Sequence, residues 1–400
     1  MVRCHARTDV GLKRKHNEDS LLADEEHGVF VVADGVGGRK AGELASAITV
    51  NTFQSFAPQL REGLERFIAD PVREHRNEVL RQLDEAANAA SRRVYEAAAS
   101  TGRQGMTTTL VTAIVGGGHA FILHVGDSRG YLLRNGALQQ LTEDHSMVNE
   151  LIRTGSMTPE EAENSRYRNV ITRAVGLYPS VRTDVLHVEL LPEDRLLLCS
   201  DGLSDMVNRD GMEDRLVSLP LVGAVDALIQ DSLDGGGKDN ITVIALEPEA
   251  SQAPDQVEAR ATAMASLFLF EDLPLQARLR VGRIVNELYP SAGECVMRQG
   301  DAGDHLFAVV SGNFSVRLKE QEVAVLGPGE HFGELALVDS LPRSADIIAT
   351  TDGHLLAIER SALGEFCRAE PALGNLLLWK LVTTLGQRLR ATNQRLMPPA

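Results

Sequence analysis

Several short runs of Val, Ile and Leu in this sequence lead straight into an aspartate. The runs VFVVA, FILHVG and LLLCS end at Asp34, Asp127 and Asp201, and Asp239 stands just before the run ITVIAL. Runs of this length and composition are typical of buried strands. The stretches ASAITVNTFQSF and NEVLRQLDEAANAASRRVYEAAAS space their apolar residues as amphipathic helices do. Strands mixed with long helices predict a layered α/β or α+β domain over residues 1–248.

The sequence changes character near residue 249. The segment 249–264 is polar at first and contains Pro and Gln, so its first half predicts a linker and its second half the start of a helix. A further helical stretch follows, and then short strand-like runs separated by glycine and a long final helix. Many short strands with glycine turns favour a small β-barrel or jelly roll. We therefore predict a second domain over residues 265–397.

Charge and composition exclude several classes of protein. The chain has 56 acidic and 40 basic residues, a net charge of −16, whereas a general nucleic-acid binder or a protein docked on anionic lipid needs a basic face. No apolar run approaches the roughly 18 residues needed to cross a bilayer. The N-terminus lacks the apolar core of a secretory signal. The four cysteines are too scattered for a zinc site or a disulfide framework. We expect a cytoplasmic protein without nucleic-acid or membrane partners.

Each aspartate at a strand end could be an ordinary turn residue, because Asp-Gly is a common turn pair. Together, however, carboxylates at the ends of buried strands can converge on one point. Clustered carboxylates repel one another unless a cation neutralises them. Such oxygen ligands suit Mg²⁺ or Mn²⁺, and two ions about 3.5–4 Å apart can turn water into hydroxide and clamp a phosphoryl group. The pattern predicts a centre for divalent metal ions.

The motifs RKHNEDS, VVADGVGGRKAGE, GMTTTL, HVGDSRGYLLRNG, LTEDHS, LLLCSDGLSDMV and GGKDNITVI, in this order, resemble those of the protein phosphatase 2C family. This family consists of metal-dependent Ser/Thr phosphatases, and the resemblance covers nearly all of residues 1–248. It implies an α+β fold in which two antiparallel sheets are sandwiched between layers of helices. It also implies phosphorylated proteins as substrates and Ser/Thr kinases as the enzymes that produce them.

The resemblance also implies the metal ligands. Asp34 would bridge two ions of Mn²⁺ or Mg²⁺, with the carbonyl of Gly35 as a further ligand. Asp201 and Asp239 would complete one metal site. Glu18 would belong to the other site, largely through water.

Other matching positions would assist. Arg14 would bind the substrate phosphate, since its planar guanidinium matches phosphate oxygens. Asp127 would join Asp201 at a weaker third metal site, as in bacterial relatives. Asn240 would not bind metal itself but would hold the metal ligands in place. Thr107, Thr108 and Thr109 either order a strand near the site or simply favour β-structure.

The implied reaction has no covalent intermediate. A hydroxide that bridges the two metal ions would attack phosphorus in line, while the ions and Arg14 stabilise charge on the phosphoryl oxygens. Some family members place a histidine after the bridging Asp-Gly as a proposed general acid, but this sequence has Val36 there. The resemblance leaves the proton donor unassigned. The segment 146–170 matches the position of the family's flap, and the resemblance implies that this segment contacts the substrate.

The most distinctive part of the second region is the segment PGEHFGELALVDSLPRSADI. Glu334 follows Gly333 at the start of a short apolar turn of helix, whose N-terminus could bind an anion. Arg343 could pair with a phosphate, and Glu334 could accept a hydrogen bond from a ribose hydroxyl. An ordinary salt bridge between Glu334 and Arg343 would explain the same residues.

In its context, this segment resembles the phosphate-binding cassette of the cyclic nucleotide-binding domain family. The resemblance covers about residues 265–397 and implies a β-jelly-roll barrel with flanking helices. It places Glu334 on the ribose 2′-OH and Arg343 on the cyclic phosphate. Gly333, Ser344 and Ala345 would be nearby contacts.

The final helix resembles that of the bacterial catabolite activator protein, in which a Thr-Ser pair meets the adenine. Thr392 and Asn393 occupy the matching places, although they could also be polar residues on an exposed helix face. Ser344, the residue after Arg343, also matches the corresponding residue of that protein. This match favours cAMP over cGMP as the ligand. That protein continues into a helix-turn-helix after this helix, whereas the present sequence ends a few residues later, so DNA binding is not expected.

The sequence therefore predicts a metal-dependent phosphoprotein phosphatase regulated by a cyclic nucleotide at its C-terminal domain. The first alternative is a cyclic nucleotide-responsive adaptor that holds phosphoproteins with little or no phosphatase activity. The second alternative is a C-terminal domain that has lost its ligand and serves in docking or dimerisation. The sequence predicts neither the substrate protein nor the oligomeric state.

Overall fold

The computed structural model describes residues 2–37, 41–103, 105–163, 165–167, 170–248, 257–258, 261–262, 264–265, 267–338 and 341–396. The chain divides into two compact units, Met1–Pro254 and Asp255–Ala400. Most of the predicted linker therefore lies outside the described residues. None of the helices within the described residues has the length and apolar character needed to cross a membrane.

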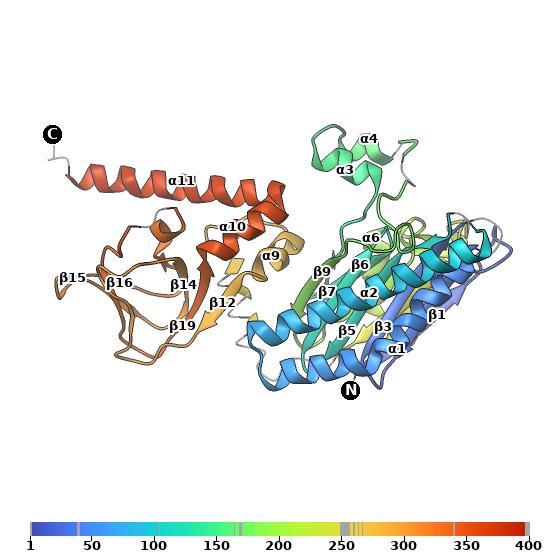
Figure 1. Ribbon diagram of the computed structural model, residues 1–400, viewed down its shortest axis with the longest axis horizontal. Coiled ribbons are helices and arrows are strands. Elements are labelled where there is room, and N and C mark those ends of the chain that lie inside the picture. Colours follow the sequence, from blue (N-terminus) through green and yellow to red (C-terminus); the bar gives the residue numbers. More distant parts are fainter. Residues whose placement is uncertain are drawn as a thin grey trace. The chain divides into compact units, whose positions relative to one another are not determined.

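Two antiparallel sheets form the centre of the first unit (Figure 1). One sheet has the order β2-β3-β5-β6-β9, with β4 beside β3, and the other has the order β1-β11-β10-β7-β8. The strands of the first sheet are β2 (Asp19–Asp24), β3 (Val29–Val36), β4 (Thr107–Thr108), β5 (Leu110–Gly116), β6 (His119–Val125) and β9 (Asp184–Glu189). Those of the second are β1 (Arg3–Asp9), β7 (Arg129–Arg134), β8 (Ala137–Gln140), β10 (Arg195–Cys199) and β11 (Ile241–Glu247).

Helices cover the outer face of each sheet. The long helices α1 (Ala41–Ala69) and α2 (Arg73–Thr101) pack on β3, β5 and β6, while α6 (Arg209–Ser218) and α7 (Leu221–Asp234) pack on β7, β10 and β11. In β3, every residue from Val29 to Ala33 is fully buried, because the strand is covered on both faces. The predicted sandwich of two antiparallel sheets between helix layers is confirmed.

The predicted flap is a small helical segment inserted between β8 and β9. It contains α3 (Met147–Arg153) and α4 (Pro159–Glu163), which stand away from the sheets of this unit in Figure 1. Its two ends are held together by an isolated antiparallel bridge between Ser146 and Ile171. The Ser146 side chain accepts a hydrogen bond from the Asn149 N–H and so caps α3.

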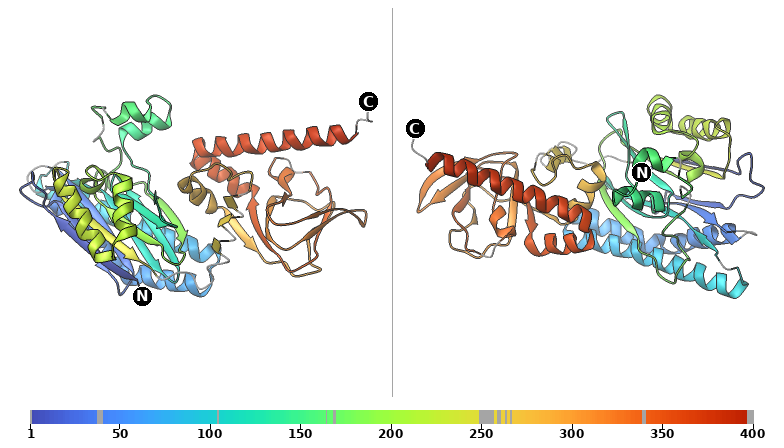
Figure 2. Two further views of the ribbon diagram at one scale, coloured as in Figure 1. Left: turned by 180° about the vertical axis from the view of Figure 1, so that it is seen from behind. Right: turned by 90° about the horizontal axis from the view of Figure 1, so that it is seen from above.

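The second unit, drawn in gold to red in Figure 2, combines strands with helices. Its strands form two four-stranded antiparallel sheets, with the orders β12-β19-β14-β17 and β13-β18-β15-β16. Their strands are β12 (Val285–Leu288), β13 (Cys295–Met297), β14 (His305–Ser311), β15 (Phe314–Leu318), β16 (Gln321–Leu326), β17 (His331–Phe332), β18 (Asp346–Ala349) and β19 (His354–Glu359). The helices are α9 (Leu275–Gly282), the single 3₁₀ turn η1 (Glu334–Leu337), α10 (Arg360–Ala369) and α11 (Pro371–Leu396).

These two sheets share no hydrogen-bonded ladder among the described strands, so the predicted jelly roll is present but does not close into a barrel. Each sheet has one short edge strand, β17 in the first and β13 in the second. Neither of these edge strands forms a ladder with a described strand of the other sheet. Apolar side chains, including Phe307, Phe314 and Phe332, fill a core between strands of both sheets.

Candidate functional site

Five carboxylates of the first unit converge where strands of both sheets end. Asp19 and Asp34 are opposite each other in the β2–β3 pair, and Asp127 follows β6. From the other sheet, Asp201 begins the short helix α5 (Asp201–Ser204) two residues after the end of β10, and Asp239 lies two residues before β11. The structure thus brings together all four aspartates that the sequence placed at strand ends.

Burial and mutual repulsion disfavour ionisation of this cluster. Burial raises the pKa of Asp34 well above its usual range, and the neighbouring charges of Asp19, Asp201 and Asp127 add to this effect. Burial, followed by the charge of Asp201, raises the pKa of Asp127 to about 7. Burial, followed by the charge of Asp239, raises the pKa of Asp201 to about 6. A divalent cation would offset this repulsion, so the donor set fits a metal centre.

Asp19 belongs to this cluster although the sequence analysis did not select it. The Oδ2 atom of Asp19 accepts hydrogen bonds from Ser200 Oγ at 2.8 Å and from Thr242 Oγ1 at 2.7 Å. Its Oδ1 atom is buried and has no hydrogen-bond partner among the described residues, and the same is true of Oδ1 of Asp201. Buried oxygens without partners are costly and suit a metal ligand. The signal in the sequence was the position of Asp19 directly after Glu18, in the motif NED.

Gly35 allows the backbone around the cluster to pack closely. A Cβ atom on Gly35 would lie 2.1 Å from the carbonyl oxygen of Gly42 and 2.6 Å from that of Glu18. The N–H of Gly35 donates to the carbonyl of Glu18 at 3.2 Å. This contact holds Glu18 beside Asp34, and burial raises the pKa of the Glu18 carboxyl.

Arg14 reaches the same cluster from the loop before β2. Its Nη2 atom is 2.6 Å from Oδ2 of Asp239, and about half of the Arg14 side chain is exposed. The Asn240 side chain donates to the carbonyls of Val10 and His16 and accepts from the N–H of Glu18. Asn240 therefore fixes the loop that carries Arg14 and Glu18.

The threonines Thr108 and Thr109 order the backbone of Asp34. Thr108 Oγ1 donates to the Asp34 carbonyl at 2.7 Å, and Thr109 Oγ1 accepts from the Asp34 N–H at 3.0 Å. Thr109 Oγ1 also lies 2.6 Å from Ser128 Oγ, which follows Asp127. Thr107 pairs with Val36 in the β3–β4 ladder, and the Val36 side chain is exposed, with no titratable group to donate a proton.

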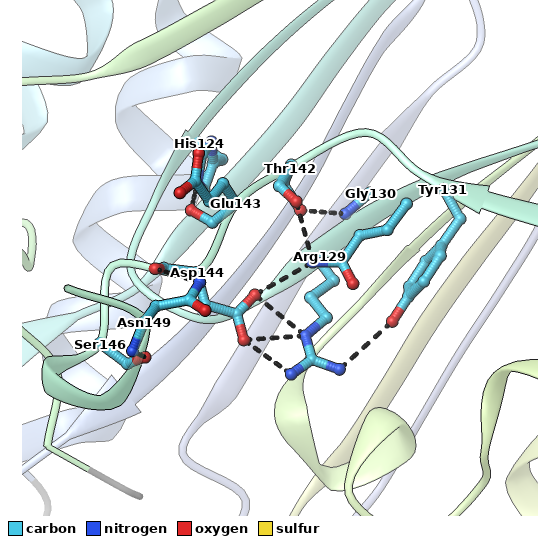
Figure 3. A network of polar contacts seen from close by, with 10 residues as sticks. His124, Arg129, Gly130, Tyr131, Thr142, Glu143, Asp144, Ser146 and Asn149 are labelled. Carbon is cyan, nitrogen blue, oxygen red and sulfur yellow. Dashed lines mark hydrogen bonds and ion pairs between the residues drawn. The ribbon is translucent and has the colours of Figure 1, made fainter. Parts of the chain in front are cut away.

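A network of polar contacts links Arg129, two residues after Asp127 in the chain, to the start of the flap (Figure 3). Arg129 forms a two-pronged ion pair with Asp144, with Nε–Oδ1 and Nη2–Oδ2 distances of 3.0 and 2.6 Å. The carbonyl of Asp144 accepts a hydrogen bond from the Asn149 side chain in α3. The turn that carries Asp127 is thereby connected to the first helix of the flap.

A second polar cluster lies at the base of the flap and was not found from the sequence. Ligand atoms of His124, His145 and Asp184 lie within 4.8 Å of one another, a compact arrangement of the kind that can hold a metal ion. Nη1 of Arg173, however, is 3.0 Å from Oδ1 of Asp184 and 3.1 Å from Nε2 of His145. This guanidinium already supplies the positive charge, so we interpret the cluster as an anchor for the flap. The backbone N–H of Gly126, next to Asp127, donates to Nδ1 of His145 at 3.1 Å.

Cys199, the last residue of β10, is fully buried two positions before Asp201. Burial raises the pKa of its thiol to about 12. At neutral pH the thiol is therefore protonated and unreactive.

In the second unit, Arg343 is a half-buried cation that forms no ion pair with a described carboxylate. Its Nη1 atom donates to the carbonyl of His305 at 3.0 Å, and the guanidinium lies 5.8 Å from the ring centre of Phe307. Burial lowers the pKa of Arg343, and the negative charge of Asp304 offsets this effect only in part. The alternative salt bridge to Glu334 is thus not formed.

Glycines make room for this arginine. A Cβ atom on Gly303 would lie 2.0 Å from Nε of Arg343, and a Cβ atom on Gly333 would lie 2.8 Å from its Nη1. Gly333 also has a positive φ of 77°, and it leads directly into Glu334, which is buried at the start of η1. The structure thus brings Gly333, Glu334 and Arg343 together.

The remaining predicted contacts of this site differ in their exposure. Ala345 is buried and Ser344 is exposed. Thr392 and Asn393 belong to α11, but their side chains lie outside the described part of the chain.

A family model matches each of the two units. The family model for protein phosphatase 2C matches residues 13–231, and the model for the cyclic nucleotide-binding domain matches residues 289–370. The serine/threonine phosphatase stp of Listeria monocytogenes is 38% identical over 255 residues, which cover 62% of this chain and 96% of that protein. The serine/threonine protein phosphatase PstP of Mycobacterium tuberculosis is 35% identical over 245 residues, which cover 61% of this chain and 44% of that protein.

Solved structures agree with these matches. The crystal structure of PstP from Mycobacterium tuberculosis superposes with a TM-score of 0.56 and 35% identity, over 62% of this chain and 99% of that one. The catalytic domain of PstP in complex with two manganese ions gives a TM-score of 0.53 and 34% identity, over 62% of this chain and 97% of that one. The chain belongs to the protein phosphatase 2C family of serine/threonine phosphatases and carries a C-terminal cyclic nucleotide-binding domain.

Proposed function

We propose that the first unit removes phosphate from phosphoserine and phosphothreonine in proteins phosphorylated by Ser/Thr kinases, with two divalent metal ions held by its carboxylate cluster. The observation that supports this most strongly is the convergence of five buried or half-buried aspartates, two of which have a carboxylate oxygen without a partner. Asp34, Asp201 and Asp239 would hold the ions with the carbonyl of Gly35 and, through water, Glu18. Asp19 joins this set, and Asp127 with Asp201 would hold a weaker third ion.

Bound Mn²⁺ or Mg²⁺ would supply an activated water and neutralise the charge of the phosphoryl group. The residues of the chain position the reactants. Arg14, now paired with Asp239, would exchange this partner for phosphate oxygens, which its guanidinium can bind in two-pronged fashion. Thr108 and Thr109 fix the backbone of Asp34, so the central carboxylate is held in place before substrate arrives.

The test is phosphate release from a phosphothreonine peptide by the full-length protein, with Mn²⁺ and with EDTA. We expect turnover only with metal, and a loss of at least a hundredfold in Asp201→Asn, because removing a charged ligand weakens both the ion and its electrostatic effect. Asp226→Asn is the matched control, because Asp226 is an exposed residue of α7 that forms an ion pair with Arg7. Manganese binding by calorimetry should fall in Asp201→Asn alone. Zero turnover at saturating Mn²⁺, with retained binding of phosphoproteins, would favour the adaptor.

We further propose that a cyclic nucleotide, cAMP in preference to cGMP, binds the second unit and regulates the phosphatase. Arg343 would bind the cyclic phosphate and Glu334 the ribose hydroxyl, with Gly333, Ser344 and Ala345 alongside and Thr392 and Asn393 near the base. The support is the guanidinium of Arg343, which is half-buried and lacks a carboxylate partner among the described residues. Regulation requires that the nucleotide distinguish two states of the protein. The proposed location is the cytoplasm, where the four free cysteines would stay reduced.

Titration calorimetry with cAMP and cGMP tests this site. We expect binding by the wild type and at least a tenfold loss in Arg343→Gln, whereas Arg368→Gln on the exposed side of α10 should bind normally. The phosphatase rate should change with cAMP in the wild type and not in Arg343→Gln. Absence of binding would instead favour a domain that serves in docking or dimerisation.

A further inference from the structure

Lysine is rare in this chain and is concentrated around the proposed metal centre. Only six of the 40 basic residues are lysines. Four of these six, Lys13, Lys15, Lys40 and Lys238, stand within five sequence positions of a proposed metal ligand. Lys40 lies outside the described residues, so the structural argument rests on the other three.

Lys13, Lys15 and Lys238 lie on two loops that touch each other. The N–H groups of Leu12 and Lys13 donate to the carbonyl of Gly237 at 2.8 and 3.2 Å. Further along the same loops, Arg14 and Asp239 form their ion pair at 2.6 Å. One loop joins β1 to β2 and the other joins α7 to β11, so both end at the carboxylate cluster. The three lysines therefore border the place where a phosphate group would bind.

All three lysines are exposed, and none of them forms an ion pair with another residue that the structure describes. Arg14, between two of them, is by contrast engaged with Asp239. In a chain of net charge −16 with 56 acidic side chains, three neighbouring lysines that form no ion pair within the described part of the chain make an unusual patch of positive charge. Such a patch attracts an acidic ligand and repels a basic one.

We propose that Lys13, Lys15 and Lys238 form a basic rim that binds acidic side chains next to the phosphorylated residue of the substrate. The proposal rests on the proposed phosphatase function and adds the class of substrate, namely phosphoserine and phosphothreonine sites flanked by Asp or Glu. Each exposed ion pair contributes little to the free energy of binding. Three such pairs together make a measurable difference between an acidic and a neutral substrate. The effect falls on substrate binding rather than on the chemical step, and salt weakens it.

The experiment compares two phosphothreonine peptides of equal length, one with Glu and one with Gln at the two positions on each side of the phosphothreonine. The full-length wild type with Mn²⁺ should prefer the Glu peptide about tenfold in kcat/KM at low ionic strength, through KM, and less in high salt. The variant with Lys13→Gln, Lys15→Gln and Lys238→Gln should lose this preference and keep the wild-type kcat. Lys319→Gln, in the turn between β15 and β16, is the control and should keep the preference.

Two results would overturn the rim. The first is a wild type that does not prefer the Glu peptide. The second is a triple variant with weaker Mn²⁺ binding and slower hydrolysis of p-nitrophenyl phosphate, which would mean that the lysines merely offset the acidic centre. If the wild type hydrolyses neither peptide nor p-nitrophenyl phosphate, the phosphatase proposal fails. Fluorescence anisotropy of both labelled peptides then still tests the rim, because the wild type should bind the Glu peptide more tightly than the triple variant does.

Discussion

Asp19 shows how one residue depends on contacts far away in the sequence. Its hydrogen-bond partners Ser200 and Thr242 come from strand ends 181 and 223 positions further along the chain. The burial of Asp34 and Asp201 could be anticipated from the apolar runs that precede them. The burial of Asp19 could not, because no apolar run marks it and its environment forms only when the two sheets meet.

Replacing Asp19 should reveal the electrostatic cost of the metal-free centre. Burial raises the pKa of Asp19 to about 7, so the folded protein holds a proton that the unfolded chain releases at lower pH. The protonated carboxyl of Asp19 therefore contributes to the stability of the fold at acidic pH, and this contribution is lost as the pH rises through about 7. In EDTA, we expect Asp19→Asn to raise the melting temperature over the wild type by a few degrees at pH 8 and by much less at pH 5. Asparagine can still accept the hydrogen bonds from Ser200 and Thr242.

Thermal unfolding followed by circular dichroism measures this difference. Asp226→Asn serves as the control, because Asp226 is an exposed residue of the same unit. Added Mn²⁺ at pH 8 should raise the melting temperature of the wild type more than that of Asp19→Asn. A melting difference between wild type and Asp19→Asn that stays constant from pH 5 to 8 would contradict the predicted role of charge.

At the scale of elements, the flap is held at its base by polar contacts rather than by a hydrophobic core. α3 has no buried residue, and the segment is joined to the sheets through the Ser146–Ile171 bridge, the Arg129–Asp144 pair and the Arg173–Asp184 pair. Elements with few buried apolar contacts open at low free-energy cost. The base of the flap is therefore where its position relative to the metal centre is set.

Arg173→Gln should loosen the flap without changing the chemistry. We expect the flap to contact a phosphothreonine peptide, so KM for the peptide should rise several-fold while kcat for p-nitrophenyl phosphate stays within about twofold. Limited proteolysis should cut the variant faster within residues 146–170. Arg153→Gln, an exposed residue of α3, is the matched control. A kcat that falls equally for both substrates would contradict this positioning role.

The strands of the first unit could be predicted from their composition, and the closure of the second unit could not. Runs such as those of β3 and β10 are continuously apolar because helices and the opposite sheet cover both faces. Whether a jelly roll closes depends on which strand edges meet, and strands as short as β13 and β17 carry almost no pattern in the sequence. The segment that resembles a phosphate-binding cassette was recognisable because its residues are neighbours in the chain.

At the scale of the whole molecule, each unit has hydrophobic cores of its own. Clusters around β3 with α1 and around β10 with α7 belong to the first unit, and clusters around β14 with α10 and between the sheets belong to the second. Each unit is therefore expected to fold without the other.

A fragment of residues 1–254 should remain an active, metal-dependent phosphatase. We expect its kcat/KM for p-nitrophenyl phosphate to stay within about threefold of the unstimulated full-length protein, because every proposed metal ligand is in this unit. It should show no response to cAMP. Circular dichroism confirms the folded state, and a fragment that is folded yet inactive would show that catalysis requires the second unit.

The buried thiol of Cys199 has a consequence for the activity of the protein under oxidative stress. Phosphatases that attack with a cysteine thiolate are inactivated when hydrogen peroxide oxidises that sulfur. Here the cysteine that lies beside the carboxylates is fully buried and protonated, and the proposed chemistry does not use it. Peroxide treatment should therefore leave the rate unchanged, and the protein would go on reversing phosphorylation in cells whose thiol-dependent phosphatases have stopped.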